Sequence, residues 1–498
     1  MIGRDLLRLC VTASLLCLPG LAPHASAQGY GSPLRMQGVN HTLVPSAASR
    51  ASGGISVGLP GEASLMFANP ASLQSLEGLQ ISLGGINLER KLDQSQQWYP
   101  NRRFPTFSLM MEGLIDLIDD PDLSEVPEGG FGPEDSIARP YDDIQPDWSR
   151  KQPGSLSIQG FVALPLEVFG LKLVAGVGAI RYANLDYYFQ NNNVLSPSIG
   201  TQRPVGIPLP AIGQEETVDW SQYIQQREGS IQGYGGALSI GIFQELSLGL
   251  SGLLLDGHSD ELETLLSRGH IRFGNNSGVY YQLLDSVYAR STRLGSSDYS
   301  GAEFSVSAMY RGPHLSLSLM VKPPSSISRT FEGSIQEDTT GTPVVSTVSG
   351  TDELLLPWRG AVGISLAVRE DLMLGLEYEI RPLASAEYTD PSGEVSQPWL
   401  SSNVFRIGGR FLITKWLAVG AGYREEAEVF QPEGNALIGE AVRYAVYSVG
   451  LGISFANVRL NAAYEYSDMT YEDKWATNVN LNRGKTHTLS ADISYLFR

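Results

Sequence analysis

The stretch ASRASGGISVGLPGEASLMFANPASLQSL spans Ala48–Leu76 and constrains the architecture more than any other part of the chain. It is rich in Gly, Ala and Ser and holds too few large apolar residues to form a domain of its own. Near its end, Asn69-Pro70-Ala71 predicts a firm turn, because proline fixes its own φ and keeps the preceding residue out of the helical region. From about Gly78 onward the sequence shows almost only β alternation. A small-residue segment ahead of many strands is suited to fold back inside them.

Residues 1–27 are typical of a secretory signal peptide. They contain a basic start, a short apolar run and a small-x-small cleavage site: Arg4 and Arg8, Leu9–Leu18, and Ala25-Ser26-Ala27. We therefore expect the mature chain to begin at Gln28. Both cysteines, Cys10 and Cys17, lie within this leader, so the exported protein needs no oxidative folding.

The formal net charge of −18 argues against nucleic acid as a partner, because a nucleic-acid surface attracts basic proteins. No window after residue 27 approaches 18 uninterrupted apolar residues, so the sequence predicts no transmembrane helix. The remaining choice is between a soluble secreted β protein and a membrane β-barrel.

The length and polarity of the strands favour the barrel. In the last strand the apolar and polar positions alternate strictly: Leu489, Ala491, Ile493, Tyr495 and Phe497 against Ser490, Asp492 and Ser494. Such segments run about 10–12 residues, which is longer than the usual strand and matches a tilted strand that crosses a bilayer. The second face carries Gly, Ser and scattered charge, as expected of a lumen.

Fourteen strands can be proposed in this way, with 12 or 16 as alternatives. Their expected ranges are 79–90, 155–164, 170–188, 229–242, 246–257, 301–311, 313–321, 359–369, 372–382, 403–412, 416–425, 442–455, 457–467 and 486–497. Short connections alternate with long ones, and both chain ends fall on the short-turn side, as in outer-membrane barrels. The predicted fold is an all-β, 14-stranded antiparallel transmembrane β-barrel over residues 78–498, with residues 28–77 as an N-terminal hatch, or plug, in its lumen.

Three local features accompany this prediction. Two stretches of the long loops, Leu109–Ile118 and Asp256–His270, are predicted as short amphipathic helices. Gly176 and Gly178 in the third strand predict a kink in the wall.

Enzyme chemistry finds little support in the sequence. The histidines after the leader show no metal-ligand spacing: His41, His258, His270, His314 and His487. No Gly-x-Ser-x-Gly motif precedes a helix, and the acidic residues do not keep the spacing of a calcium loop. We expect no catalytic residues, no metal site and no cofactor.

Six charged side chains are expected to face the lumen, two on each of three strands: Glu377 and Glu379, Arg406 and Arg410, and Arg459 and Glu465. Buried charges must be paired or hydrated, so these side chains predict an ion-pair network that holds barrel and plug together. Ligand binding is the alternative role.

The stretch Ala48–Leu76 resembles the N-terminal hatch of the FadL/TodX family of outer-membrane transporters for long-chain fatty acids and aromatic hydrocarbons. The matching residues are Arg50-Ala51, Gly53-Gly54, Ala63-Ser64, Phe67, Asn69-Pro70-Ala71 and Leu73. The family has 14 strands with the hatch inside the barrel, in agreement with the strand count. The resemblance implies a gating role for six of these positions: Gly53, Gly54, Phe67, Asn69, Pro70 and Ala71.

The resemblance also implies a function. A hydrophobic ligand would enter from the external loops, bind in an apolar upper lumen and leave sideways through the wall once the hatch shifts. The protein would lie among the lipids of a Gram-negative outer membrane, and its C-terminal strand would be read by the barrel-assembly machinery, although Arg498 follows the terminal aromatic Phe497. The hatch is similar, too, to that of the PorV/PorQ barrels of type IX secretion, which handle secreted proteins. A secreted protein partner and a purely structural barrel therefore remain alternatives.

Overall fold

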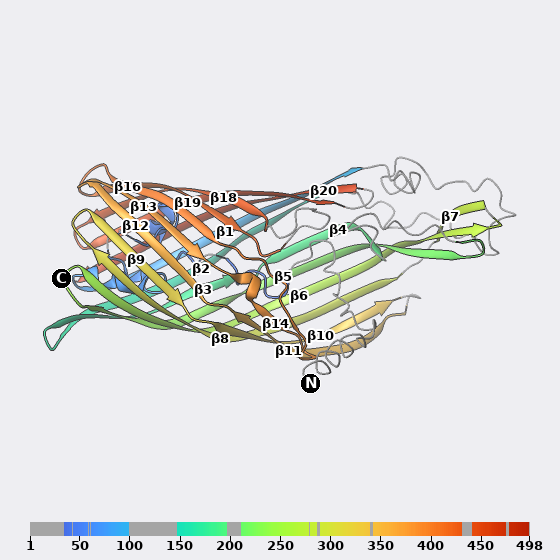
Figure 1. The fold of residues 1–498 in the computed structure, drawn as a ribbon, viewed down its shortest axis with the longest axis horizontal. Coiled ribbons are helices and arrows are strands. Elements are labelled where there is room, and N and C mark those ends of the chain that lie inside the picture. Colours follow the sequence, from blue (N-terminus) through green and yellow to red (C-terminus); the bar gives the residue numbers. More distant parts are fainter. Residues whose placement is uncertain are drawn as a thin grey trace, which may run out of the picture.

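The computed structural model describes residues 34–41, 43–57, 59, 61–98, 147–196, 211–277, 279–285, 289–338, 342–430, 441–474 and 478–497. They form one antiparallel sheet of twenty strand segments that closes into a barrel (Figure 1). The predicted signal peptide and the predicted helix Leu109–Ile118 lie outside the described residues.

The first ten strand segments are β1 (Leu79–Trp98), β2 (Trp148–Val168), β3 (Leu171–Asn184), β4 (Tyr187–Ser196), β5 (Glu215–Gly241), β6 (Leu246–Asn276), β7 (Val279–Asp285), β8 (Arg290–Arg311), β9 (Leu315–Lys322) and β10 (Ser325–Asp338). The other ten are β11 (Val344–Leu356), β12 (Arg359–Arg369), β13 (Leu372–Ile380), β14 (Glu387–Thr389), β15 (Val395–Ser396), β16 (Val404–Leu412), β17 (Leu417–Ala427), β18 (Arg443–Phe455), β19 (Val458–Lys474) and β20 (Asn478–Phe497).

These segments make up fourteen wall strands, which confirms the predicted fold class. Four wall strands are interrupted and so appear as two segments each. The segments β3 and β4 both pair with β5, and β9 and β10 both pair with β8. The segments β11 and β12 likewise follow one another, as do β13 and β14. Two short segments, β7 and β15, pair only with the strand segment just before them. The barrel closes where β1 pairs with β20 from Leu79↔Phe497 to Trp98↔Asn478.

Several wall strands are longer than the sequence predicted. β5 has 27 residues and β6 has 31, whereas roughly 9–11 suffice to cross a bilayer. The predicted helix Asp256–His270 is therefore wrong: this stretch continues β6. It pairs with β5 on one side and, as far as Leu266, with β8 on the other. Two ladders of backbone hydrogen bonds outweigh the weak helical pattern of its leucines.

The outer face of the wall is apolar, as expected of a membrane barrel. Large side chains exposed on it include Leu83, Val162, Leu250, Val306, Val362, Leu374, Ile407, Val449 and Leu489. No helix among the described residues is long and apolar enough to cross a bilayer.

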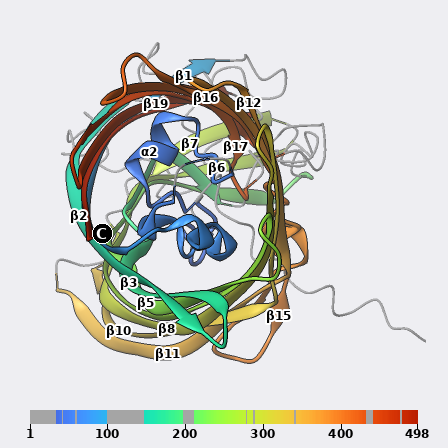
Figure 2. The ribbon, with the colours of Figure 1, turned by 90° about the vertical axis from the view of Figure 1, so that its left-hand side faces the viewer.

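The described part of the segment before β1, from residue 34 onward, lies inside the barrel (Figure 2). Its described residues form one α-helix and two 3₁₀ turns: α2 (Ala47–Ala51), η2 (Ala63–Leu65) and η3 (Pro70–Ser75). Another 3₁₀ turn, η5 (Leu383–Ser385), follows β13. The helix α2 packs against β17, β18, β19 and β20, while η3 packs on the other side against β3, β5, β6 and β8. The plug therefore touches opposite walls of the lumen.

Candidate functional site

The paired glycines of the plug lie where only glycine fits. Gly53 and Gly54 both have positive φ, at 76° and 86°, a region that L side chains rarely adopt. A Cβ on Gly53 would lie 2.6 Å from the carbonyl oxygen of Ile407 on β16 and 3.0 Å from the amide nitrogen of Tyr423 on β17. The Gly-Gly pair thus lets the plug backbone lie directly on the wall. The wall also presents glycines at this contact, because Gly408 and Gly422 face Ser52 and Gly53.

The Asn-Pro-Ala corner is fixed to the opposite wall. Asn69 precedes η3, whose first residue is Pro70. The backbone N–H of Ala71 donates to Ser307 Oγ at 2.8 Å, and its carbonyl accepts a hydrogen bond from Ser247 Oγ at 3.0 Å. Phe67 packs near Phe161 of β2, with 6.3 Å between ring centroids. The corner and Phe67 therefore seat the plug on strands far from those that contact α2.

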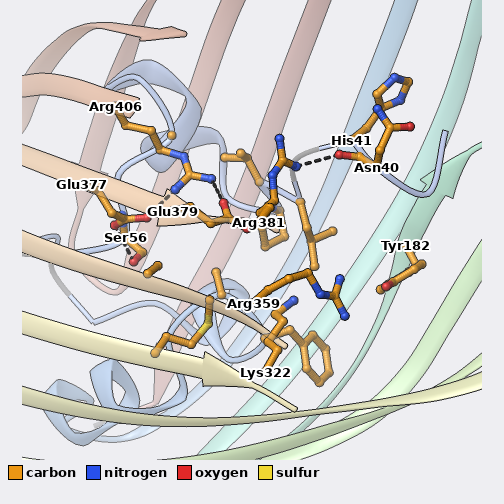
Figure 3. A pocket seen from close by; sticks show the side chains of 18 of the residues that line it. Asn40, His41, Ser56, Tyr182, Lys322, Arg359, Glu377, Glu379, Arg381 and Arg406 are labelled. Atoms are coloured by element: carbon orange, nitrogen blue, oxygen red, sulfur yellow. Dashed lines mark hydrogen bonds and ion pairs between the residues drawn. The ribbon is translucent and has the colours of Figure 1, made fainter. Parts of the chain in front are cut away.

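Two of the predicted lumen charges meet at Arg406. Glu377 accepts a hydrogen bond from Arg406 at 2.8 Å, and Glu379 pairs with the same guanidinium (Figure 3). Glu377 also accepts hydrogen bonds from the backbone N–H and the hydroxyl of Ser56, both at 2.9 Å. This cluster ties the plug to β13 and β16.

Glu465 lies at the centre of a second cluster. It is 2% exposed and pairs with Arg50 of α2 and with Arg424 of β17. Arg424 in turn pairs with Glu426. Sequence reasoning missed Arg424 and Glu426, although their alternating positions in the Tyr423–Ala427 run place both on the inward face.

The last two predicted charges lie apart from these clusters. Arg459 lies 3.5 Å from Glu62 of the plug, and Glu62 also accepts a hydrogen bond from Ser46 at 2.6 Å. Arg410 lies beside Gly452 and makes no ion pair with the residues that the structure describes. The six predicted side chains thus belong to several separate contacts with the plug and the wall.

Two further buried clusters were not foreseen. Glu303 of β8 binds Lys322 at 2.6 Å and Arg359 at 2.8 Å, and it accepts a hydrogen bond from the hydroxyl of Tyr182 at 2.7 Å. Arg329 of β10 pairs with Asp352 of β11 and reaches Glu261 of β6 at 3.2 Å. Each cluster joins residues that are distant in sequence. They meet because the pairing register places Lys322 opposite Arg359 and Arg329 opposite Asp352.

The start of the plug is held by polar side chains from several strands. Arg381 donates to the carbonyl oxygen of Asn40 at 2.6 Å (Figure 3), and Gln159 of β2 donates to that of Pro45. Glu428 accepts a hydrogen bond from Gln37 at 3.1 Å. Burial alone would raise the pKa of Glu428, but hydrogen bonding and the charge of His41 outweigh burial and hold that pKa below its usual value.

Two cavities lie on either side of this plug segment. The larger has a cavity volume of about 210 Å³, and the smaller, more polar one has a cavity volume of about 50 Å³ (Figure 3). They share a partition formed by His41, Leu43, Val44 and Pro45. The larger cavity combines apolar and aromatic walls with charge: Ile86, Leu88, Leu92, Trp148, Tyr188, Phe189, Phe430, Val446, Met469 and Tyr471, together with Arg90, Arg181 and Asp186.

The wall beside the larger cavity has a seam without backbone pairing. β2 and β3 pair only from Gly160↔Ala179 to Val168↔Leu171. Beyond that point, toward the long loops, the described residues of β2 pair only with β1, and those of β3 and β4 pair only with β5. Side chains bridge the seam: Arg181 donates to Ser155 Oγ at 3.3 Å, and Arg150 stacks on Tyr188 at 3.9 Å. Backbone pairing of β3 is continuous through Gly176 and Gly178, and its register shifts only between Arg181 and Ala183, so the kink at the two glycines stays a prediction.

The lower end of the seam reaches the apolar outer face. Leu156 and Ile158 of β2 flank it and are each 67% exposed on the outside. Gln159, which holds the plug, is the first residue of β2 above the last β2–β3 pair. The cavity, the plug and the membrane-facing surface therefore meet at one place. No group of three or more His, Cys, Asp or Glu side chains in the described part of the chain could hold a metal ion.

This architecture is that of the FadL/TodX-type barrels. A Pseudomonas aeruginosa FadL homologue is 13% identical, with 92% of this chain and 99% of that chain covered and a TM-score of 0.57. The Pseudomonas putida toluene transporter TodX is 12% identical, with 92% and 99% covered and a TM-score of 0.54. The monoaromatic hydrocarbon channel CymD is 11% identical, with 90% and 97% covered and a TM-score of 0.54.

These likenesses establish the fold, and the described functions belong to those proteins. In sequence, no family model and no curated protein matches this chain.

Proposed function

We propose that this protein is a passive outer-membrane transporter of hydrophobic molecules, such as long-chain fatty acids or aromatic hydrocarbons. The observation that carries the proposal is the larger cavity, which lies above the plug and beside the unpaired seam. Its aromatic and aliphatic walls suit an apolar body, and its arginines suit a polar end. The similar solved structures described as transporters and channels of toluene and other monoaromatic hydrocarbons support the same class of ligand.

The ligand leaves sideways through the seam. An apolar molecule gains roughly 25 cal/mol per Å² by staying out of water, so a path from the cavity to the lipid is favoured over a path into the periplasm. Separating β2 from β3 and β4 above Gly160 breaks no backbone ladder that the described strands form with one another. The side-chain bridges from Arg181 and Arg150 are the contacts that must yield. This lateral route supports transport over the protein-docking alternative.

Filling the larger cavity should weaken ligand binding strongly. A Cβ on Gly484 would lie 3.5 Å from Leu92 and from Met469, both of which line the cavity, so Gly484→Phe places a ring inside it. We expect binding of radiolabelled oleate to the detergent-purified protein to weaken by about tenfold or more, because the ring occupies space the ligand needs.

Gly85→Phe is the matched control, since a side chain there meets Leu156 on the outer face. The barrel fold of both variants is checked by heat-modified gel mobility. Unchanged oleate affinity in a folded Gly484→Phe variant would exclude this cavity as the ligand site. If the unaltered protein binds no oleate, the same assay with labelled toluene decides whether any apolar ligand is taken.

Loosening the plug at the seam should speed transport. Gln159→Leu removes the donor to the Pro45 carbonyl while keeping the volume of the side chain. A hydrogen bond contributes about 1 kcal/mol net, so we expect roughly a fivefold rise in the rate at which proteoliposomes take up labelled oleate. Gln232→Leu is the control, because its amide bonds only Ser230 within the wall. Equal uptake rates in the two variants would show that the hydrogen bond from Gln159 to Pro45 does not slow transport.

A further inference from the structure

Three lysines form one cross-strand row on the outside of the barrel. Lys91 on β1 lies directly opposite Lys151 on β2 and opposite Lys485 on β20. Directly opposed residues have Cβ atoms about 4.5–5.5 Å apart, and like charges at that spacing destabilise a sheet. The electrostatic repulsion between these lysines therefore destabilises the sheet, and an anion in contact with them would reduce that repulsion.

Carboxylates on the same face neutralise part of the charge of the row. Lys91 binds Asp93 at 3.0 Å, and Lys151 binds Glu89 at 2.9 Å. Arg483, on the same face of β20, binds Asp468 at 2.9 Å. Lys485 lies directly opposite Asp468 of β19, but it makes no ion pair within 4 Å among the described residues. The side chains of Lys91 and Lys151 stay 51% and 65% exposed, so their ammonium groups can still contact a ligand.

The row lies just beyond the apolar surface of the barrel. On β20 the outward face reads Leu489, His487 and Lys485 in the direction of the long loops. Leu489 is 58% exposed, and its partner Tyr464, which donates or accepts a hydrogen bond with His487, is 41% exposed. Four residues of strand cover roughly 13 Å, so the lysines lie at the height of lipid headgroups. Tyrosines at this level are typical of a membrane interface.

The opposite wall differs in charge at the corresponding level. On β6 the residues beyond the exposed Leu254 are Asp256, His258 and Asp260, and His258 pairs with Asp298 of β8. That wall carries no lysine among its described residues between 246 and 311. In a chain with a formal charge of −18, the row of lysines on β1, β2 and β20 is local, although the β6–β8 wall carries arginines such as Arg290.

We propose that the row Lys151–Lys91–Lys485 is a binding site for the phosphate group of an outer-leaflet lipid. Lysine ammonium groups bind phosphate as point charges, and three of them on adjacent strands surround its oxygens from one side. The acyl chains then lie along the apolar surface that begins at Leu489. Lys91 and Lys485 are the central contacts, with Arg483 at the edge of the site. The site rests on the proposed membrane location but not on the transported ligand.

The double variant Lys91→Gln/Lys485→Gln tests this assignment. The probe is diphosphorylated lipid A added to the detergent-purified full-length protein and followed by native mass spectrometry. Each lysine near an anionic lipid contributes roughly a fivefold factor, so we expect binding to weaken by about thirtyfold. Lys415→Gln is the control, because that lysine lies at a short turn between β16 and β17, at the other end of the barrel.

Three results would overturn the proposal. Dephosphorylated lipid A bound as tightly as the phosphorylated form would show that the phosphate is not recognised. Inorganic phosphate that competes at equal concentration would assign the site to a soluble anion instead of a lipid. Unchanged lipid binding in the folded double variant would exclude the lysines. Oleate binding by the same double variant should equal that of the unaltered protein, so failure here and failure of the transport proposal are distinguishable.

Discussion

Replacing Glu465 with glutamine should destabilise the folded barrel by about 3–5 kcal/mol, the usual cost of removing one partner from a buried ion pair. Glu465 is 2% exposed and neutralises Arg50 of the plug and Arg424 of the wall. In the variant Arg424 keeps Glu426, but Arg50 has no other carboxylate within 4 Å among the described residues. The cost therefore falls mainly on the contact between α2 and the wall.

Equilibrium unfolding in guanidinium, followed by tryptophan fluorescence, measures this effect. Glu425→Gln is the matched control: it removes a pair with Arg443 on exposed side chains, which contributes about 0–1 kcal/mol. The double variant Arg50→Gln/Glu465→Gln should recover part of the loss, because it removes the uncompensated charge. A Glu465→Gln protein as stable as Glu425→Gln would show that the cluster does not hold the plug.

Adding a single methyl group at Gly422 should dislodge the plug. A Cβ there would lie 2.5 Å from the Cα of Gly53 and from the carbonyl carbon of Ser52. Both are backbone atoms, so no side chain can rotate away, and Gly53 is already confined to positive φ. Overpacking of this kind costs about 1–3 kcal/mol. Because only the plug can yield, we expect Gly422→Ala to fold as a barrel with a displaced plug and a markedly higher conductance in planar bilayers.

Gly85→Ala provides the comparison for this experiment. Its nearest neighbour would be Leu156 Cδ1 at 3.5 Å, an ordinary van der Waals contact on the outer face. Its conductance should match that of the unaltered protein. If Gly422→Ala conducts no better than Gly85→Ala, the close approach of Gly53 to the wall does not seal the lumen.

The fourteen wall strands could be predicted from the sequence, because the period-two alternation that builds them is a local property. The last strand shows this well: its outward positions, from Leu489 to Phe497, are apolar, and its inward positions from Ser490 to Ser494 are polar. The heights of the strands could not be predicted in the same way. Beyond the membrane the outer face becomes polar, so the alternation in Asp256–His270 fades although β6 continues.

In the candidate site, too, some features follow from local alternation, and others depend on the pairing of distant strands. Glu377, Arg406 and Glu465 could be placed in the lumen by parity alone, and each of them does contact the plug or its neighbours. Parity would also have placed Glu303 of β8 inside, but its partners Lys322 and Arg359 come from strands whose pairing depends on register. The seam between β2 and β3 could not be predicted from the sequence, because it is defined only by where the backbone pairing of the two strands ends, at Gly160↔Ala179.

The position of α2 bears on how the barrel folds. β1 and β20 are separated by almost the whole chain, and joining two such distant strands is slow because the connecting loop must first lose its freedom. The helix α2 lies just ahead of β1 in sequence and packs on β17, β18, β19 and β20. If it binds that C-terminal hairpin early, it shortens the free chain between β20 and β1 to the segment from Ala51 to Leu79. The plug then serves as a template for the β1–β20 ladder, and the barrel closes around a plug that is already bound to its C-terminal strands.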